Sequence, residues 1–408
     1  MDNSADNPDI VVIGSGISGL AYAWKAAQTG RKVLILEKRD RIGGCIYSYR
    51  FKDGYWYELG AHTVYNSYSR LLDIVEQTGL TDQLVPRGPA RVHFGLLKQG
   101  KIDWLTPPRI LLRLNWLGIL LHAPFGFFHS RRNRTLEQHY SGILGKQNFR
   151  KILSPFFAAV PSQCADAFPA EGPGSLFKKR VRRKEFPRSF GFKGGLQSLC
   201  DAIAGHTNIS IQNGCTAVTV SPVQDGFEIQ ANNGNRIPAR EIAIAVPHEE
   251  AASLLQKHYT SVSKALRRIG TAAVESLGTR LPKNKCRLRD CAFVVPVEDL
   301  YFSSVSRDPF PDTAWRGFAF HFRPGATYDQ KLERMCDLFQ VTQEDLDHTA
   351  GQNLTLPAPR ANHAEIVADI EKIMSNKNFA LLGNYFSGLA IEDCIDRAHT
   401  EWLRLNQA

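Results

Sequence analysis

Three glycines near the N-terminus constrain the fold of this chain more than any other feature. They form the motif Gly14-x-Gly16-x-x-Gly19, which follows an apolar run at 10–13 and precedes a helix-like stretch. Gly14 permits a tight turn out of a strand, Gly16 lets the backbone approach a pyrophosphate, and Gly19 lets a helix pack against the strand. The motif therefore predicts a strand, a phosphate-binding turn and a helix.

The segment after the motif completes a β-α-β unit. A second apolar run ends at Glu37, which lies 23 residues after Gly14, where a carboxylate commonly binds ribose hydroxyls. The helix between the two strands would begin at Ile17 and Ser18, so that free backbone N–H groups meet the phosphates. Together these features predict that the chain binds a dinucleotide.

A second glycine pair directly follows the second strand. The segment from Lys38 to Cys45 contains Arg41, Gly43 and Gly44. Glycines here would let the backbone pass close to the phosphates and the flavin of a cofactor, and Arg41 would supply charge for phosphate or ribose. The pattern resembles the glutathione-reductase-like FAD proteins, in particular the amine oxidase and protoporphyrinogen oxidase superfamily. Cys45, in place of the Arg that amine oxidases usually carry, is closer to the protoporphyrinogen (coproporphyrinogen) oxidase branch.

Further segments resemble this family in the family's order, so that the anchors extend from residue 9 to about residue 395. These segments are 57–61, 192–199, 214–220, 242–247, 293–299 and 381–395. The resemblance implies FAD as the cofactor, with Gly60, Ala61 and His62 by the flavin and the backbone of Val218 by the adenine. It also implies a C-terminal contact with the cofactor through Gly383, Asn384, Gly388, Leu389 and Ala390.

The C-terminal motif also has a physical reason that does not depend on the resemblance. Gly388 precedes an apolar stretch that would open a helix. Backbone N–H groups at the start of that helix would stabilise charge on the flavin pyrimidine. Asp393 lies within the first turns and favours this helix end.

The predicted fold class is α/β, with a Rossmann-like, glutathione-reductase-like FAD-binding domain interleaved with an α+β substrate domain. The FAD-binding domain would be discontinuous and comprise 1–80, 190–255 and 360–408. The substrate domain would comprise the insertions 81–189 and 256–359. A chain of 408 residues that is 43% hydrophobic is long enough for two such domains.

Basic and apolar segments in the first insertion raise the question of a membrane. The net charge is +10, and much of it lies in the runs 131–134 and 178–184. Each run would be a solvated surface or would face an anionic substrate or membrane. The apolar stretch Ile110 to Phe128 is interrupted by polar residues and is too short to span a bilayer. This stretch is part of the segment 104–134. The segment would lie in a membrane interface, as the protoporphyrinogen oxidase resemblance implies, or the stretch would form a core helix.

The remaining composition restricts compartment and partners. The chain begins without a basic or apolar leader, and its eight cysteines are scattered without a Cys-x-x-Cys pair or a metal-ligating cluster. These features predict reduced cysteines, no metal, and a protein that is cytoplasmic or peripheral at the inner face of the membrane. No nucleic-acid-reading motif accompanies the basic charge, so the expected partner is a small-molecule substrate, anionic if the charge serves binding.

Two residues are the candidates for catalysis. A flavin without a nucleophile, metal or thiol pair beside it accepts a hydride at N5. If the substrate is a porphyrinogen, as the resemblance implies, its propionates need cations. Arg91 falls where the substrate-carboxylate arginine of the family tends to lie. His62 departs from the family, because Gly60-Ala61-His62 is more similar to UDP-galactopyranose mutase and related sugar flavoproteins, in which a histidine lies by the flavin.

Three functions therefore stay open at the level of sequence. The first is a porphyrinogen oxidase, and the second is an amine, amino-sugar or desaturase-type flavin oxidoreductase. The third is a non-redox flavoprotein such as a sugar mutase. Amine oxidation predicts a lysine near N5 and an aromatic cage that includes Tyr385 and Phe386, whereas a mutase predicts an arginine pair for a diphosphate. The physiological substrate, the electron acceptor and the oligomeric state do not follow from the sequence.

Overall fold

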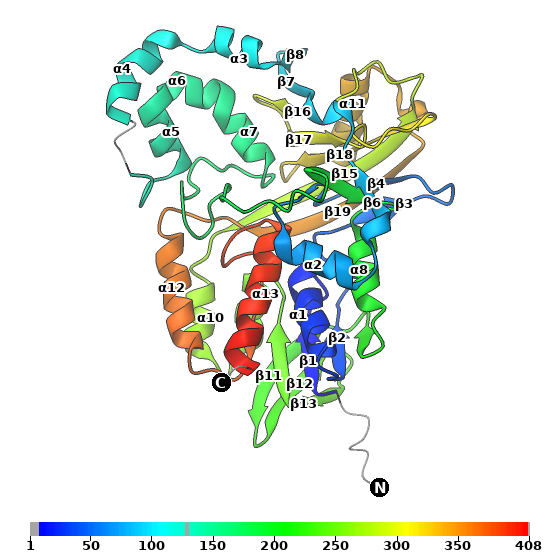
Figure 1. Cartoon of the computed structure of the whole chain (residues 1–408), viewed down its shortest axis with the longest axis vertical. Helices are drawn as coiled ribbons and strands as arrows, with labels where there is room; N and C mark the ends of the chain where they lie inside the picture. Colours follow the sequence, from blue (N-terminus) through cyan, green and yellow to red (C-terminus); the bar gives the residue numbers. More distant parts are fainter. Residues whose placement is uncertain (1–7, 127–129, 407–408) are drawn as a thin grey trace.

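The structure is a computed structural model that describes residues 8–126 and 130–406. Two main sheets organise these residues (Figure 1). A parallel sheet and its helices form the half of the molecule that carries both chain ends, and a long mixed sheet with a helical layer forms the other half. The segment 1–7 and Phe128 of the apolar stretch lie outside the described residues.

The parallel sheet has the strand order β10-β2-β1-β14-β20 within the described chain. Its strands are β1 (Ile10–Ile13), β2 (Val33–Leu36), β10 (Ile209–Gln212), β14 (Glu241–Ile244) and β20 (Ala380–Leu381). Ile10 pairs with Val33 on one side and with Glu241 on the other. The four residues of β1 are buried, as expected of apolar, β-branched strands that are covered on both faces.

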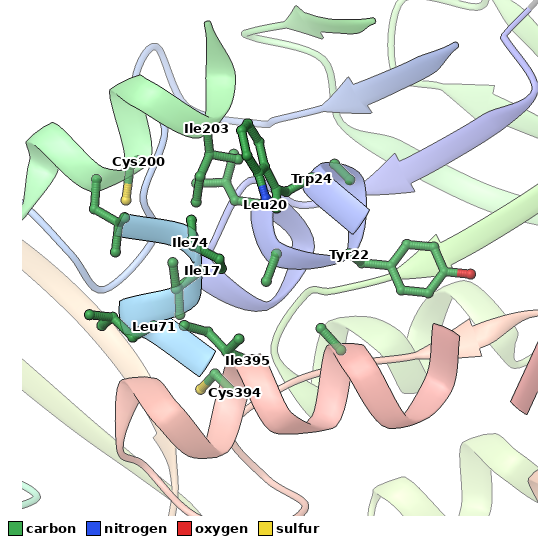
Figure 2. Packing of buried hydrophobic residues seen from close by; sticks show 14 of the residues in the cluster. Ile17, Leu20, Tyr22, Trp24, Leu71, Ile74, Cys200, Ile203, Cys394 and Ile395 are labelled. Atoms are coloured by element: carbon green, nitrogen blue, oxygen red, sulfur yellow. The ribbon is translucent and has the colours of Figure 1, made fainter. Parts of the chain in front are cut away.

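Helices cover one face of this sheet. They are α1 (Ile17–Ala27), α2 (Ser69–Gln77), α8 (Gln197–Ala204) and α13 (Ile391–Asn406). Figure 2 shows Leu20 and Trp24 of α1 packing with Ile203 of α8, while Ile17 meets Leu71 of α2 and Ile395 of α13. This apolar core fixes the start of α1 against the last helix of the chain.

The opposite face is covered by an antiparallel meander and by a second group of helices. The meander consists of β11 (Ala217–Val223), β12 (Gly226–Ala231) and β13 (Arg236–Ala239), and the helices are α9 (His248–Leu255), α10 (Thr260–Leu266) and α12 (His363–Met374). Their apolar side chains form one cluster with the outer face of β1 and β14.

The second large sheet has the strand order β19-β15-β18-β17-β16-β7-β8 in the described residues. Its strands are β7 (Phe94–Lys98), β8 (Lys101–Leu105), β15 (Thr271–Pro282), β16 (Phe293–Pro296), β17 (Tyr301–Ser306), β18 (Trp315–Phe322) and β19 (His348–Pro357). The helix α11 (Tyr328–Phe339) packs on it through Met335 and Phe339. β7 and β16 pair in parallel, so this sheet joins both insertions.

A helical layer lies beside this sheet (Figure 1). It consists of α3 (Pro107–Arg113), α4 (Trp116–Gly126), α5 (Leu136–Leu144), α6 (Lys146–Asn148), the π-helix η3 (Phe149–Leu153) and α7 (Ser154–Ala159). Thr135 and Gln138 form a capping box that starts α5. Leu136, Phe149 and Phe157 form a small core of their own.

Short ribbons connect the two halves. They are the pair β3 (Ser48–Arg50) and β4 (Trp56–Glu58), the sheet of β5 (Val64–Tyr65), β9 (Ser189–Phe192) and β6 (Leu84–Pro86), and the turns η1 (Thr81–Gln83), η2 (Pro89–Val92) and η4 (Gln343–Asp345). Because β9 pairs with both β5 and β6, residues more than 100 positions apart are held together at this junction.

The predicted α/β class is confirmed. The parallel strands fall within 1–80, 190–255 and 360–408, and the strands of the seven-stranded sheet fall within 81–189 and 256–359. The helix α10 differs, because it belongs to 256–359 by sequence but packs with α9 and α12 against the parallel sheet. Its apolar residues Val262 and Leu266 complete the core beside the parallel sheet, and a boundary drawn from composition does not reveal this.

Candidate cofactor and active site

A cavity of about 690 Å³ lies where β1 ends and α1 begins. The glycine loop is shaped by close contacts: a Cβ on Gly19 would lie 2.1 Å from the carbonyl oxygen of Gly14, and a Cβ on Gly14 would lie 2.8 Å from that of Ala245. A Cβ on Gly16 would meet nothing within 4 Å, and Gly16 lines the cavity. The loop therefore leaves room for a ligand at Gly16, whereas Gly14, which also lines the cavity, packs against Ala245.

The start of α1 adds the donors that a phosphate needs. Gly16 is the N-cap of this helix, and no side chain caps its first N–H groups. Ile17 and Ser18, the first residues of the helix, line the cavity. Uncapped N–H groups at the positive end of a helix dipole bind anions, so this helix end suits a pyrophosphate.

Glu37 directly follows β2 and lies at the cavity wall in a fixed orientation. Its Oε2 accepts hydrogen bonds from the backbone N–H of Ser15 at 2.9 Å and from the Ser15 hydroxyl at 2.5 Å. Its Oε1 accepts from the Arg39 N–H at 3.0 Å. The carboxylate is thus held between the glycine loop and the end of the second strand, and it remains on the cavity wall, where a ribose would bind.

The second glycine pair packs directly on the first glycine motif. Gly43 and Gly16 form an isolated parallel bridge, and Gly44, with φ of 60°, would bring a Cβ to 3.0 Å from the Cα of Gly16. Only glycines fit this approach of two backbone segments.

Cys45 and Lys38 also line the cavity, and the Lys38 Nζ forms an ion pair of 2.5 Å with Glu250 at its rim.

Arg41 has a different role from the one that the sequence predicts. It is absent from the cavity wall, and its guanidinium donates to the carbonyl oxygens of Gly44 at 3.1 Å and Ile46 at 3.2 Å. It also donates to Gln352 of β19 at 2.7 Å and lies over the Tyr47 ring. Arg41 therefore holds the glycine-pair loop in place and has no free donor set directed at a phosphate.

The opposite end of the cavity is lined by a β-bulge. The pairing of β11 with β12 shifts between Ala217 and Thr219, so that Val218 has no partner in the ladder. Val218 lines the cavity. A bulge leaves backbone groups unpaired and aims them away from the sheet, which suits hydrogen bonding to an adenine.

The C-terminal motif closes the other side of the cavity. Gly383, Asn384 and Leu389 line it, whereas Gly388 and Ala390 flank the wall. Gly388 packs against Asp393, since a Cβ on it would lie 2.6 Å from the Asp393 carboxylate. The helix α13 begins at Ile391, just after this loop, as the sequence predicts.

Three cations of the basic run 178–184 form ion pairs with other residues of the protein. Lys178 and Arg180 each contact the buried Asp393 at 2.8 Å, and Lys178 also donates to the carbonyl of Ser387 at 2.8 Å. Arg183 pairs with Glu76 at 2.9 Å. These three cations therefore stabilise the C-terminal loop and α2, and they do not form the solvated or ligand-facing surface that the charge pattern suggests.

The two candidate catalytic residues lie apart from the large cavity. Ala61 lines that cavity, while His62 lines a neighbouring small cavity of about 20 Å³ together with Arg87 and Arg307. Burial, with a contribution from Arg87, lowers the pKa of His62 to about 4. His62 is therefore neutral at physiological pH, and its Nδ1 lies 3.4 Å from the carbonyl oxygen of Gly60.

Arg91 lies on the exposed turn η2 and lines neither of these two cavities. Its guanidinium donates to the carbonyl oxygens of Arg87 at 3.0 Å and Gly88 at 3.2 Å. The sequence predicts that Arg91 binds the substrate, but the structure does not bring Arg91 to the wall of either cavity. The side chain that reaches the small cavity from this segment is Arg87, four residues earlier.

The structure brings most of the predicted cofactor residues together. Those that line the large cavity are Gly14, Gly16, Ile17, Ser18, Glu37, Lys38, Gly43, Gly44, Cys45, Ala61, Val218, Gly383, Asn384 and Leu389. The other predicted cofactor residues, Gly19, Arg41, Gly60, His62, Gly388 and Ala390, do not line it. Sequence reasoning missed the contribution of residues 353–355, which line the cavity from β19 and carry no motif.

Tyr385 and Phe386 are fully buried in the core beneath the parallel sheet. They therefore cannot form the aromatic cage that amine oxidation would require. Lys38 is the lysine found on the wall of the large cavity in the described chain, and its charge is paired with Glu250.

Comparison with known proteins agrees with this site. The family described as flavin containing amine oxidoreductase matches residues 17–335. The protoporphyrinogen oxidase of Bos taurus is 25% identical over 95% of this chain and 96% of its own length, and that of Nicotiana tabacum chloroplasts is 24% identical over 96% and 84%. The 15-cis-phytoene desaturase of Narcissus pseudonarcissus is 38% identical, but only over 103 residues, so the chain spans 18% of the length of this relative.

Solved structures share the fold. A protein of Exiguobacterium sp. 255-15 that is provisionally named a protoporphyrinogen oxidase has a TM-score of 0.79 at 19% identity, covering 98% of this chain and 99% of its own. Cyclohexylamine oxidase of Brevibacterium oxydans has a TM-score of 0.70 at 15% identity, with 98% and 99% covered. The glycine cradle and Glu37 fit the cofactor of this family. The chain therefore belongs to the flavin-containing amine oxidoreductases and is an FAD-dependent oxidoreductase.

Proposed function

We propose that this enzyme oxidises a porphyrinogen to a porphyrin. The observation that carries the proposal is the extent of similarity: the protoporphyrinogen oxidases align with nearly the whole chain, whereas the desaturases align with about a quarter of it. Bound FAD would supply the acceptor for a hydride from a substrate C–H bond, while an N–H proton leaves to solvent. Oxygen or another acceptor would then take up the electrons.

The residues of the chain would bind and orient the reactants. The glycine cradle, the start of α1 and Glu37 hold the dinucleotide, and the loop before α13 closes over the other side of the cavity. His62, which is neutral, presents its ring nitrogens next to Ala61 on the wall of the small cavity. Burial of Tyr385 and Phe386 favours this function over amine oxidation.

Anaerobic mixing of the yellow holoenzyme with a porphyrinogen tests the proposal. We expect the flavin absorbance to bleach and porphyrin fluorescence to appear in proportion. If amines or a polyene bleach the flavin and a porphyrinogen does not, the enzyme is a different flavin oxidoreductase. If no donor bleaches the flavin but the chemically reduced enzyme interconverts nucleotide sugars, the enzyme is a mutase.

We also propose that α3 and α4 contact an anionic membrane surface. The described residues hold no helix that is long and apolar enough to cross a bilayer. Exposed apolar side chains nevertheless gather on these two helices, whereas a core helix would bury them. These side chains are Leu111, Leu112, Trp116, Leu117, Leu120 and Leu121. Exposed arginines at 109, 113, 131 and 132 flank them. Apolar side chains with flanking cations suit a helix that lies in the headgroup region.

Flotation with vesicles of phosphatidylcholine and phosphatidylserine tests this contact. We expect the wild-type protein to float with the vesicles and the double variant Leu112→Ser, Leu120→Ser to remain at the bottom. Val181→Ser, which changes an equally exposed apolar residue outside these helices, is the matched control. Equal flotation of all three proteins would exclude α3 and α4 as the contact.

A further inference from the structure

A long connection without helix or strand joins α7 to β9. It comprises residues 160–188, and a connection of this length in a compact domain usually has a function of its own. Two backbone hydrogen bonds hold its later part. The Gly174 N–H donates to the carbonyl oxygen of Ser387 at 2.8 Å, and the Arg183 N–H donates to that of Asn66 at 2.8 Å. Between these two points lies the segment 177–182, which we call the strap.

The inner side of the strap is fixed by ion pairs. Lys178 and Arg180 each contact the buried Asp393 at 2.8 Å, and the Arg180 guanidinium lies 5.4 Å from the centre of the Tyr68 ring. Asp393 belongs to the first turn of α13, and Tyr68 directly precedes α2, so the strap is tied to both helices. A segment that is already ordered loses little further entropy when it binds a partner.

Side chains of the strap alternate between the inner side and solvent. Lys178 and Arg180 point inward, whereas Phe177 is 56% exposed and Val181 is 84% exposed. Lys179, between them, is exposed as well. No turn or bend interrupts the strap, so this period of two indicates an extended chain. The outer side therefore presents an apolar, a cationic and an apolar side chain in a row.

The backbone of the strap lacks hydrogen-bond partners within the described chain. No N–H group and no carbonyl group of residues 177–182 forms a hydrogen bond with a described residue, because the bonds made here come from the side chains. An extended segment with unpaired backbone groups resembles the edge of a sheet, to which a further strand can add. The backbone of such a strand would satisfy these groups.

Positive charge on the outer side is not balanced within the described residues. Lys179, Arg182 and Lys184 are exposed and form no ion pair there, whereas Glu185 pairs with Arg183 at 2.8 Å. Like charges that face each other destabilise paired strands, so the strap repels a second copy of itself. A strand with acidic side chains would instead be attracted to it.

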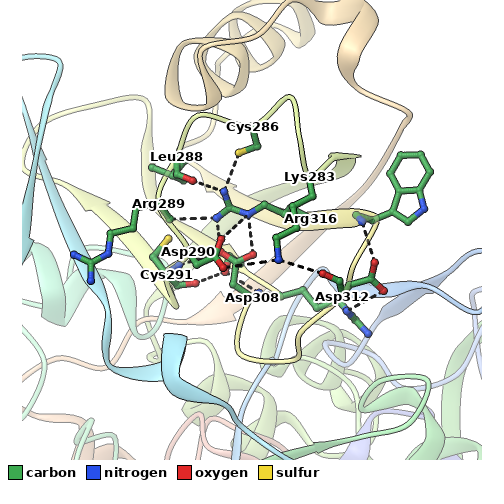
Figure 3. A network of polar contacts seen from close by, with 12 residues as sticks. Lys283, Cys286, Leu288, Arg289, Asp290, Cys291, Asp308, Asp312 and Arg316 are labelled. Carbon is green, nitrogen blue, oxygen red and sulfur yellow. Dashed lines mark hydrogen bonds and ion pairs between the residues drawn. The ribbon is translucent and has the colours of Figure 1, made fainter.

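The cations of another loop region are balanced by the chain itself (Figure 3). Lys283 lies 4.0 Å from the Asp290 carboxylate, and its Nζ donates to the carbonyl oxygen of Asp312 at 3.2 Å. The Arg316 Nε donates to the Asp308 carboxylate at 2.9 Å. The aspartates neutralise these cations, so an acidic partner is not attracted to this region as it is to the strap.

We propose that the strap binds an acidic, extended segment of a partner protein, which adds to it as a strand. The carboxylates of the partner would face Lys179 and Arg182, and its apolar side chains would cover Phe177 and Val181. An anionic membrane also attracts cations and apolar side chains, but it offers no regular partner for the unpaired backbone. Such binding is independent of the substrate that the enzyme oxidises.

Fluorescence anisotropy with the holoenzyme tests the strap. The probe is a fluorescein-labelled synthetic peptide in which glutamate and valine alternate. We expect Lys179→Glu combined with Arg182→Glu to weaken binding of this peptide at least tenfold. Arg240→Glu combined with Lys257→Glu changes the net charge equally at exposed cations outside the strap and should bind the peptide like the wild type. Both double variants should melt with the wild type, because none of these cations forms an ion pair with a described residue.

Two modified peptides separate strand addition from attraction between charges. A peptide with lysine in place of glutamate should not bind. A peptide with N-methyl groups on its backbone amides keeps its side chains and its charge but cannot donate hydrogen bonds to the strap, so it should bind at least tenfold more weakly. Equal binding of the methylated and the unmodified peptide would overturn strand addition.

Other occupants of the strap have distinct signatures. If the strap contacts a membrane, Lys179→Glu combined with Arg182→Glu prevents flotation with phosphatidylserine vesicles, while wild type and variant bind the peptide alike. If the strap contacts a second copy of the chain, light scattering shows a wild-type dimer that this variant does not form. Either result overturns the proposal, as does equal binding of the peptide by wild type and variant.

Discussion

Gly16 and Gly19 lie three residues apart, yet their side-chain hydrogens face different surroundings. A methyl group at position 19 would enter the carbonyl oxygen of Gly14 at 2.1 Å, whereas one at position 16 would point into the large cavity. We expect Gly19→Ala to lower the free energy of unfolding of the apoprotein by about 1–3 kcal/mol. Gly16→Ala should melt close to the wild type but bind FAD at least tenfold more weakly.

Chemical denaturation of the apoprotein and flavin fluorescence titration measure the two effects. Gly205→Ala, at the end of α8, is a suitable control because its Cβ would make ordinary contacts of 3.4 Å or more. Gly16→Ala protein that unfolds as easily as Gly19→Ala would show that position 16 serves folding and not the cofactor.

His62 and its neighbour His321 couple the stability of the site to pH. Burial lowers the pKa of His62 to about 4 and that of His321 to about 3, well below the usual value. An unfolded chain binds protons at higher pH than the folded one, so this stabilisation is present above about pH 6.5 and is lost as the pH falls toward 4. In His62→Gln, the free energy of unfolding should fall less on acidification, by on the order of 2–3 kcal/mol.

Urea denaturation at pH 7 and at pH 4.5 gives the comparison, with the exposed His258→Gln as the control. We expect the wild-type protein and His258→Gln to lose stability in parallel and His62→Gln to lose less. A His62→Gln curve that parallels the wild type would mean that His62 is already protonated, or freely solvated, in the folded protein.

At the residue scale, the sequence is informative where function depends on local backbone geometry. Gly14, Gly16 and Glu37 occupy fixed positions in a β-α-β unit, so their spacing predicts their location on the cavity wall. Long side chains are different, because their direction depends on neighbours that are distant in sequence. Arg41 turns to the carbonyls of its own loop, and Arg91 turns away from both cavities, although each stands at the position that the family pattern suggests.

At the scale of elements, Glu392 links the last helix of the chain to α2. Its carboxylate accepts hydrogen bonds from the N–H groups of Arg70 at 2.9 Å and Leu71 at 3.1 Å, so it caps a helix that lies more than 300 residues earlier. Glu392→Ala should lower the free energy of unfolding by about 1–3 kcal/mol, because it leaves two N–H groups without acceptors. It should also speed hydrogen exchange at Arg70 and Leu71.

Hydrogen exchange followed by mass spectrometry, with thermal melting, measures this effect. Glu365→Ala, in the first turn of α12 and exposed, removes a carboxylate at a comparable helix position without removing such a contact. Unchanged exchange at the start of α2 in Glu392→Ala would show that water caps the helix equally well. The sequence predicts the C-terminal helix, but the pairing of its Glu392 with the start of α2 depends on packing.

The same limit applies to the strand β19. The sequence places residues 353–355 in a substrate insertion, but the register of β19 with β15 carries them to the wall of the large cavity. No glycine motif marks them, because they need to supply only a surface. The helix α10 shows the converse case, in which a segment of an insertion packs into the core of the FAD-binding half.

At the scale of the whole molecule, the large cavity is lined from both halves. Gly14, Glu37 and Val218 belong to the FAD-binding half, whereas residues 353–355 reach it from the seven-stranded sheet. A ligand that binds only the folded protein stabilises it by about 2.7 kcal/mol when its concentration is 100 times Kd. Because FAD would contact both halves, we expect its removal to loosen them together. Apoprotein should melt at a lower temperature and exchange amide hydrogens faster at 353–355 as well as at 14–18, while β13, which lies off the cavity, should change little. Faster exchange confined to 14–18 would show that the cofactor stabilises its own domain alone and that β19 only covers the cavity.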